Sequence, residues 1–239
     1  MDDIPLPYDH CFRTSAGCCT ERFCCRLCKN RVVFRLAEYI DYLQRLHFRG
    51  VVFLHKPVNK TTYIALLRGI NVSGSNLIKM PVLQTLFEAA GCEAVKTYMQ
   101  SGNVVFTHQT LTCQDLVGKI MNMIRNELEM NVPVLVMKRS ELLEIRQNNP
   151  FLHGRNEEVS QLHVTFLSEK PDPEKWEKMD PGKYLPDELV LADQVIYLFC
   201  PSGYGKTKLH NNFFESKLKV TATTRNWKTI LALADGFQD

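Results

Sequence analysis

The chain has 239 residues, of which 45% are hydrophobic and 23% are charged, and these proportions are ordinary for a globular protein. It contains no run of about 18 apolar residues, so we expect no membrane-spanning helix. The net charge of +3 comes from the first segment, because residues 1–60 hold 10 Lys and Arg against 6 Asp and Glu, whereas residues 61–239 hold 19 against 20. A near-neutral body is not typical of a nucleic-acid-binding protein.

Residues 1–60 read as a cysteine-rich N-terminal extension. Six of the nine cysteines lie in the first 28 residues, but only Cys25 and Cys28 form a C-x-x-C pair. Because a structural zinc site usually has two such pairs, we expect no metal here, although Cys19 or His10 could supply further ligands. A disordered leader and a misassigned start codon are both open interpretations of this segment. Its polar start lacks the apolar core of a signal peptide, which favours a cytoplasmic protein.

After an amphipathic helix expected at residues 32–48, residues 61–149 show the order β-α-β-β-α-β. This is the split βαβ, or ferredoxin-like, arrangement. Gly91 suits the end of the first helix of this half, and Ser101-Gly102-Asn103 suits a hairpin turn. The expected elements are strand 63–67, a helix that begins at Pro81, strands 95–99 and 104–107, helix 111–130, strand 132–137, and a short helix 140–148 with Ser140 as its N-cap.

Residues 150–239 repeat this order less completely, as β-α-β-β-α. We therefore predict an α+β protein with two ferredoxin-like halves, residues 61–149 and 150–239, which follow the N-terminal extension. The expected elements of the second half are strand 162–167, helix 173–179, strands 189–191 and 195–199 joined through Ala192-Asp193-Gln194, helix 206–218, and a last helix 225–233.

The strongest local signal for a binding site follows strand 195–199. The loop Cys200-Pro-Ser-Gly-Tyr-Gly leads directly into the predicted helix, and a strand, a Gly-rich turn and a helix N-terminus together can bind phosphate. Gly205-Lys206-Thr207 matches the end of a P-loop, but Cys200 stands where that motif needs its first glycine. The alternative is that the two glycines only shape the entry to a helix.

A second polar loop, residues 68–79, also lies at a strand end, where it could clamp an anion together with the hairpin turn. Residues 195–228 hold six Lys and Arg against Glu215 alone, which fits an anion site or, alternatively, a solvated lysine-rich face. We predict a binding protein for an anionic, phosphate-bearing small molecule, and no motif indicates a catalytic residue, a cofactor or a metal. The expected ligand-binding residues are Arg68, Asn71, Lys79, Ser101, Asn103, Gly203, Tyr204, Gly205, Lys206, Lys208, Arg225 and Asn226. In the other interpretation these side chains fix the shapes of the loops, and Thr224 or Asn226 caps the last helix.

Two other classes of function stay open. A phosphoryl-transfer or hydrolytic enzyme at the same loops would need a metal-holding carboxylate near Thr207, which the sequence does not show. An RNA-binding module would need aromatic side chains on its sheet, for which Tyr98 and Phe106 are the best available. We interpret Cys200 as a buried, inert thiol and His163 as a packed strand residue. Nothing in the sequence indicates an oligomeric state.

Four motifs, in order and in spacing, carry a resemblance to a known family. They are TYIALLRGINVSGSNLIKM, TYMQSGNVVF, GYGKTKLHNNFFESKL and ATTRNWKT. Over about residues 61–234 the chain resembles bacterial proteins of the domain-of-unknown-function family 1697. The resemblance implies an α+β protein with two ferredoxin-like halves, and it implies no activity. Residues 1–60 fall outside it, which fits an extension or a start-site artefact, since family members typically begin just before TTYIALLRGIN.

Overall fold

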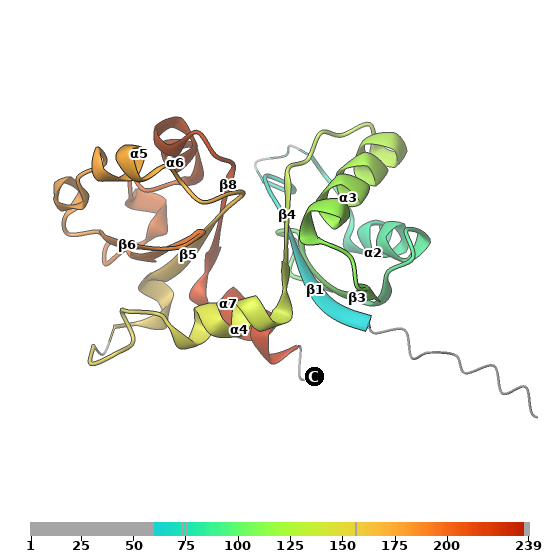
Figure 1. The fold of residues 1–239 in the computed structure, drawn as a ribbon, viewed down its shortest axis with the longest axis horizontal. Helices are drawn as coiled ribbons and strands as arrows, with labels where there is room; N and C mark the ends of the chain where they lie inside the picture. Colours follow the sequence, from blue (N-terminus) through green and yellow to red (C-terminus); the bar gives the residue numbers. More distant parts are fainter. Residues whose placement is uncertain (1–59, 73, 75, 156, 237–239) are drawn as a thin grey trace, which may run out of the picture. The chain divides into compact units, whose positions relative to one another are not determined.

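The computed structural model describes residues 60–72, 74, 76–155 and 157–236 (Figure 1). The predictions for the cysteine-rich segment and for the helix at residues 32–48 therefore lie outside the described residues. Within the described ranges, no helix is both long enough and apolar enough to cross a membrane.

The first half folds as a four-stranded antiparallel sheet with two helices on one face (Figure 1). The strand order is β2-β3-β1-β4, and the apolar run from Tyr63 to Leu67 lies buried in the interior strand β1. The predicted order β-α-β-β-α-β is confirmed. The elements are β1 (Lys60–Leu67), α2 (Met80–Ala89), β2 (Glu93–Tyr98), β3 (Asn103–Gln109), α3 (Cys113–Leu128), β4 (Val134–Lys138) and α4 (Arg139–Gln147).

The second half has the same arrangement, with the strand order β6-β7-β5-β8. One prediction is wrong here: Arg225 and Asn226 belong to strand β8, which pairs with β5, and the last helix begins only at Trp227. The second half is therefore a complete ferredoxin-like unit, and the predicted fold class is confirmed. Its elements are β5 (Leu162–Leu167), α5 (Pro173–Glu177), β6 (Glu188–Ala192), β7 (Val195–Phe199), α6 (Asn211–Leu218), β8 (Ala222–Asn226) and α7 (Trp227–Asp235), with short 3-10 turns at Val159–Gln161, Pro181–Tyr184 and Tyr204–Lys206.

The helix that we expected to begin at Lys206 begins at Asn211 instead. The intervening chain is held in a non-helical turn, because the hydroxyl of Thr207 accepts the N–H of Leu209 at 3.0 Å and the Leu209 side chain is fully buried. The ring of His210 then caps the helix by accepting a backbone N–H. The Gly-rich loop thus does not run directly into a helix N-terminus, which was the geometry that favoured phosphate.

Two predictions about helix caps have opposite outcomes. Ser140 is not the N-cap of α4, because the helix begins at Arg139 and the carboxylate of Glu141 accepts the N–H of Lys138 at 3.1 Å. Asn226 does cap α7, where its side-chain oxygen accepts the N–H of Thr229 at 2.8 Å. The cap accounts for Asn226 without a ligand.

Three apolar cores hold the described residues together. One packs α2 and α3 against the first sheet, and another packs α5 and α6 against the second sheet. The third lies between them, where the opposite faces of both sheets meet α4 and α7; it contains Leu66, Phe166 and Trp227. Because this middle core is shared, the division of the chain into two domains at residue 150 stays a prediction.

Candidate functional site

Arg225 lies between the two halves and is fully engaged by internal contacts. A guanidinium has five N–H groups, and all five donate within the protein. Burial lowers the pKa of Arg225 to about 10, so the side chain is charged at neutral pH. A ligand could reach the guanidinium only by displacing one of its acceptors. The acceptors are Asn103 Oδ1, Thr223 Oγ1, and the backbone oxygens of Thr224, Leu67 and Ser101.

Arg68 makes the reciprocal contact, from the end of β1 into the second half. Its Nε donates to the backbone oxygen of Ala222 at 2.9 Å, and its Nη2 lies 2.7 Å from both Asn212 Oδ1 and Glu215 Oε2. The ion pair with Glu215 is about three-quarters buried on each side. We call Arg68 and Arg225 the arginine clamp, because each side chain begins in one half and bonds to the other.

The polar loop residues of the first half hold their own loops in shape. The side-chain amide of Asn71 donates to the backbone oxygens of Ile78 and Gln100, at 2.9 and 2.8 Å. The side-chain amide of Asn103 donates to Ser101 Oγ at 3.0 Å while its oxygen accepts from the arginine clamp. These contacts match the structural alternative that the sequence left open.

The loop from Gly203 to Lys208 has a packed part and an exposed part. The Tyr204 ring stacks on the ring of His163, with centroids 4.7 Å apart, which fixes the loop against β5. Lys206 and Lys208 are exposed, and the described residues offer neither side-chain ammonium group a hydrogen-bond or ion-pair partner. These two lysines, like the exposed Lys79 of the first half, offer free ammonium groups to the predicted anion site.

The structure brings only part of the predicted site together. The arginine clamp joins the Ser101–Asn103 turn to β8, and Arg225 is close enough to Tyr204 to oppose the rise in pKa that burial causes in that phenol. Within the described residues, no hydrogen bond or ion pair links Lys79, Lys206 or Lys208 to this cluster. A ligand role for the twelve predicted residues stays a prediction.

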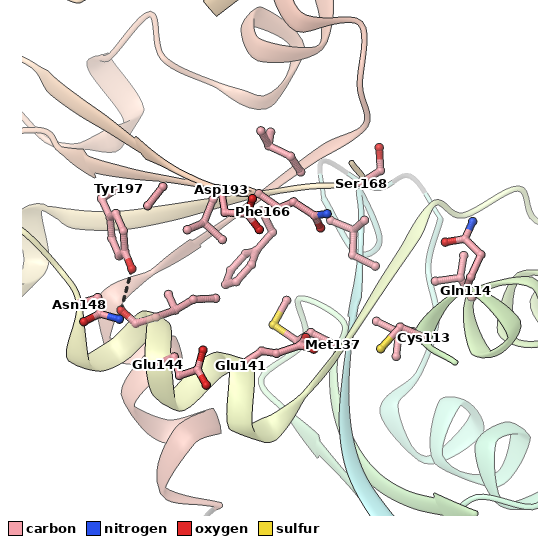
Figure 2. A pocket seen from close by; sticks show the side chains of 18 residues that line it. Cys113, Gln114, Met137, Glu141, Glu144, Asn148, Phe166, Ser168, Asp193 and Tyr197 are labelled. Atoms are coloured by element: carbon pink, nitrogen blue, oxygen red, sulfur yellow. Dashed lines mark hydrogen bonds between the residues drawn. The ribbon is translucent and has the colours of Figure 1, made fainter. Parts of the chain in front are cut away.

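A cavity of about 600 Å³ lies beside the shared core, and none of the twelve predicted ligand-binding residues lines it (Figure 2). Both halves line it: α3, β4 and α4 from the first, and β5, β7 and the β6–β7 turn from the second. Its size is that of a typical small-molecule site. The lining residues are Cys113, Gln114, Val117, Leu135, Val136, Met137, Glu141, Glu144, Ile145, Asn148, Phe166, Leu167, Ser168, Ala192, Asp193, Gln194, Val195 and Tyr197.

The charged side chains that line this cavity are all acidic. Glu141 and Glu144 lie on α4, and Asp193 lies in the β6–β7 turn, so both halves contribute carboxylates. No Lys, Arg or His is among the lining residues. Glu141 accepts a backbone N–H, and Asp193 pairs at 3.2 Å with the exposed Lys170, which lies outside the lining.

The floor of the cavity is apolar and fixed. Phe166 and Val195 are buried members of the shared core, and Figure 2 shows the Phe166 ring between the second sheet and α4. The hydroxyl of Tyr197 donates to the backbone oxygen of Ile145 at 3.0 Å, and burial raises the pKa of Tyr197 to about 12. The phenol therefore stays neutral and holds α4 against the second sheet.

Sequence reasoning missed this cavity. Its lining comes from separate segments of both halves, and each residue alone reads as an ordinary helix, strand or turn residue. The one sequence signal that points toward it is the hairpin through Asp193, which was predicted and which β6 and β7 confirm. Only the packing of the two sheets brings these segments together.

The groups that other functions would require are placed as follows. Phe106, proposed as a base-stacking aromatic, is fully buried and packs on Tyr63 and Phe87. Cys200 is fully buried, and that burial raises the pKa of its thiol to about 12, as expected for an inert cysteine. Among the described residues, no group of three or more His, Cys, Asp or Glu side chains is placed to hold a metal ion.

Comparison with solved structures finds a conserved bacterial protein, SP0830, from Streptococcus pneumoniae. The match has a TM-score of 0.60 and 24% sequence identity, and it covers 74% of this chain and 98% of that one. At this identity the likeness shows the fold. Among curated proteins, none matches the sequence.

The family described as "Protein of unknown function (DUF1697)" matches residues 60–197, which is more than half of the chain. This match confirms the resemblance to the family; it contains the first two of the four sequence motifs, and the other two lie beyond residue 197. The family supplies relatives with the same sequence pattern, but its description assigns no activity to them. The chain belongs to this DUF1697 family, whose function is unknown.

Proposed function

We propose that the protein binds a small organic molecule in the cavity between its two halves. The observation that carries this proposal is the cavity itself: about 600 Å³, with an apolar floor and a polar rim. Small-molecule sites generally have volumes of about 300–1,000 Å³, mostly apolar walls and a few polar groups that orient the ligand. The apolar wall of this cavity is its floor of Phe166, Val195 and Tyr197. The polar groups include the side-chain amides of Gln114, Asn148 and Gln194.

A ligand in this cavity would contact both halves at once. It would lie against α4, which belongs to the first half in sequence but packs in the shared core, and against β5 and β7 of the second sheet. Ligand binding should therefore stabilise the folded protein as a whole.

The test is a thermal-denaturation screen of the full-length chain against a library of small metabolites. A ligand at about 100 times its Kd stabilises the folded state by about 2.7 kcal/mol, which gives a clear rise in melting temperature. The variant Ala192→Trp places an indole at the cavity wall, and we expect it to abolish the shift. Val190→Trp, on the same strand but outside the lining, is the matched control and should keep it.

A ligand that shifts the wild type and the Ala192→Trp variant equally would bind elsewhere. That result would count against the cavity as the functional site.

A second candidate function is the predicted binding of a phosphate-bearing anion at the Gly203–Lys208 loop. It is favoured by the two exposed lysines, Lys206 and Lys208, which flank Thr207 on one short loop. Exposed lysines attract phosphates as point charges without a fixed geometry. The arginine clamp does not add to this site, because all five donors of Arg225 are engaged within the protein and the charge of Arg68 is paired with Glu215.

The double variant Lys206→Ala/Lys208→Ala tests this candidate with ATP and inorganic phosphate as probes. We expect binding to weaken strongly and to depend steeply on salt. Lys217→Ala, an exposed lysine on α6, is the control. Equal binding by the double variant and by the control would remove the loop from consideration.

A further inference from the structure

We infer that the cavity accepts an organic cation: an amine or guanidinium group carried on an apolar or aromatic body. This inference rests on the proposed function, since it assigns a chemical class to the ligand of that same cavity. It combines three observations: the sign of the charges at the rim, the aromatic floor and the source of the carboxylates.

The first observation is the segregation of charge. The body of the protein has nearly equal numbers of acidic and basic residues, yet the described lining of this cavity has Glu141, Glu144 and Asp193 and no basic side chain. An anionic ligand would be repelled by three carboxylates, whereas a cation would be attracted by all of them.

The second observation is independent of charge and concerns the floor. Phe166 and Tyr197 both line the cavity, and both are held in place by the shared core. Aromatic rings attract organic cations through their electron-rich faces, and the interaction strengthens when the cation is desolvated. Carboxylates above an aromatic floor form the combination that recognises an ammonium group attached to an apolar body.

The third observation is where the carboxylates come from. Glu144 lies on α4 and Asp193 lies across the cavity in the β6–β7 turn, so a cation between them would neutralise charge from both halves (Figure 2). The Glu144 carboxylate has no hydrogen-bond or ion-pair partner among the described residues, and the ion pair of Asp193 is highly exposed, at 73% of its side chain. Both groups are therefore available to a ligand. A bare metal ion does not fit the same arrangement, because the described part of the chain gathers no set of metal ligands.

The experiment compares three probes that share a phenyl ring and differ in charge: 2-phenylethylamine, 2-phenylethanol and 3-phenylpropionate. Binding to the full-length protein is measured by ligand-observed NMR titration. We expect the amine to bind at least about tenfold more tightly than the alcohol, and the acid to bind most weakly.

The double variant Glu144→Gln/Asp193→Asn keeps the shape of the side chains and removes two charges. It should weaken binding of the amine by about tenfold and leave binding of the alcohol unchanged. The matched control is Glu127→Gln, an exposed carboxylate on α3 outside the lining, which should change neither.

The two proposals fail in different ways. If the alcohol or the acid binds as tightly as the amine, and Ala192→Trp abolishes that binding, the cavity is a ligand site but the cationic class is wrong. If the amine binds equally well to the wild type and to Ala192→Trp, or if no probe binds, both the cavity and the cationic class are overturned.

Discussion

Arg225 shows how the role of one side chain depends on where its donors are used. It is buried, it carries a charge, and it faces only neutral oxygen acceptors from both halves. We expect Arg225→Met to destabilise the protein by about 3 kcal/mol or more, because several buried acceptors would lose their donor. Urea denaturation of the variant and the wild type measures the difference.

Arg146→Met is the control for this change. Arg146 pairs with Asp235 on a surface where both side chains are substantially exposed, so its loss should cost less than about 1 kcal/mol. Similar losses in the two variants would show that the internal contacts of Arg225 contribute little.

His163 provides a prediction about pH. Burial lowers its pKa, and a contact of 3.3 Å with the backbone oxygen of Gln161 opposes the effect only in part. The unfolded chain, with a His pKa of about 6.5, therefore takes up the proton at a higher pH than the folded protein does. More protons bound in the unfolded state mean that the free energy of unfolding falls as the pH drops below about 6.5.

The variant His163→Phe should flatten this dependence between pH 7 and pH 5, as followed by chemical denaturation at each pH. Tyr204→Phe keeps the stacked ring beside His163 and should retain the slope. An unchanged slope in His163→Phe would assign the acid sensitivity to other groups.

At the scale of residues, sequence reasoning succeeded where the role is local. The cap at Asn226 and the buried strand position of His163 follow from neighbours along the chain. Arg68 and Arg225 were placed in a ligand site because their bonding partners in the other half are more than a hundred residues away. A single sequence cannot distinguish an arginine that awaits an anion from one that already has its acceptors.

At the scale of elements, the β2–β3 turn depends on one glycine. Gly102 has φ of +72°, and a Cβ atom there would lie 2.7 Å from Leu67 Cβ and 2.8 Å from Ile70 Cδ1. Gly69 has a similar φ of +70° but open space around it. Gly69→Ala should therefore cost about 1 kcal/mol from backbone strain alone. Gly102→Ala should cost roughly 1–3 kcal/mol more, because the core must also shift.

Thermal and urea denaturation of both variants measure this difference. Equal losses would mean that the turn moves freely away from β1, which its hydrogen bond from Leu67 N to Gly102 O argues against.

The elements that were misplaced share a physical cause. Strand β8 is short and polar, so its extended form comes from pairing with β5 and from the clamp, not from its own alternation. The start of α6 was placed too early because Gly205-Lys206-Thr207 resembles the entry to a P-loop helix, whereas in the fold the buried Leu209 anchors a non-helical segment before Asn211. Long, periodic elements such as α3 were placed within two residues at each end.

At the scale of the whole molecule, the shared core predicts that both halves unfold together. Both tryptophans belong to the second half in sequence; Trp176 packs against the core under α5 and α6, and Trp227 lies in the shared core. Leu66→Ala, in the first sheet, should lower the free energy of unfolding by about 2–5 kcal/mol. The urea midpoint of the fluorescence transition should fall accordingly. Fluorescence and far-ultraviolet circular dichroism should give coincident transitions.

Separate transitions, or a fluorescence midpoint that is the same in Leu66→Ala and in the wild type, would show that the two halves are energetically independent. In that case the predicted domain division at residue 150 would be supported instead.

The arrangement of the two sheets also explains what the sequence could not reveal about binding. The order of strands and the fold class follow from periodicity and turn residues within each half. The cavity follows from the way that α3, α4 and the β6–β7 turn meet across the shared core. Contacts between segments so far apart leave no mark on local patterns.

The path of the chain between the sheets has one more consequence. Each sheet is built from one continuous stretch of sequence, and the chain passes from the first to the second a single time, through the exposed loop around Gly154. A protease cut there would leave every strand pairing intact. The two fragments would then behave as the subunits of a heterodimer, with the middle core and the arginine clamp as their interface.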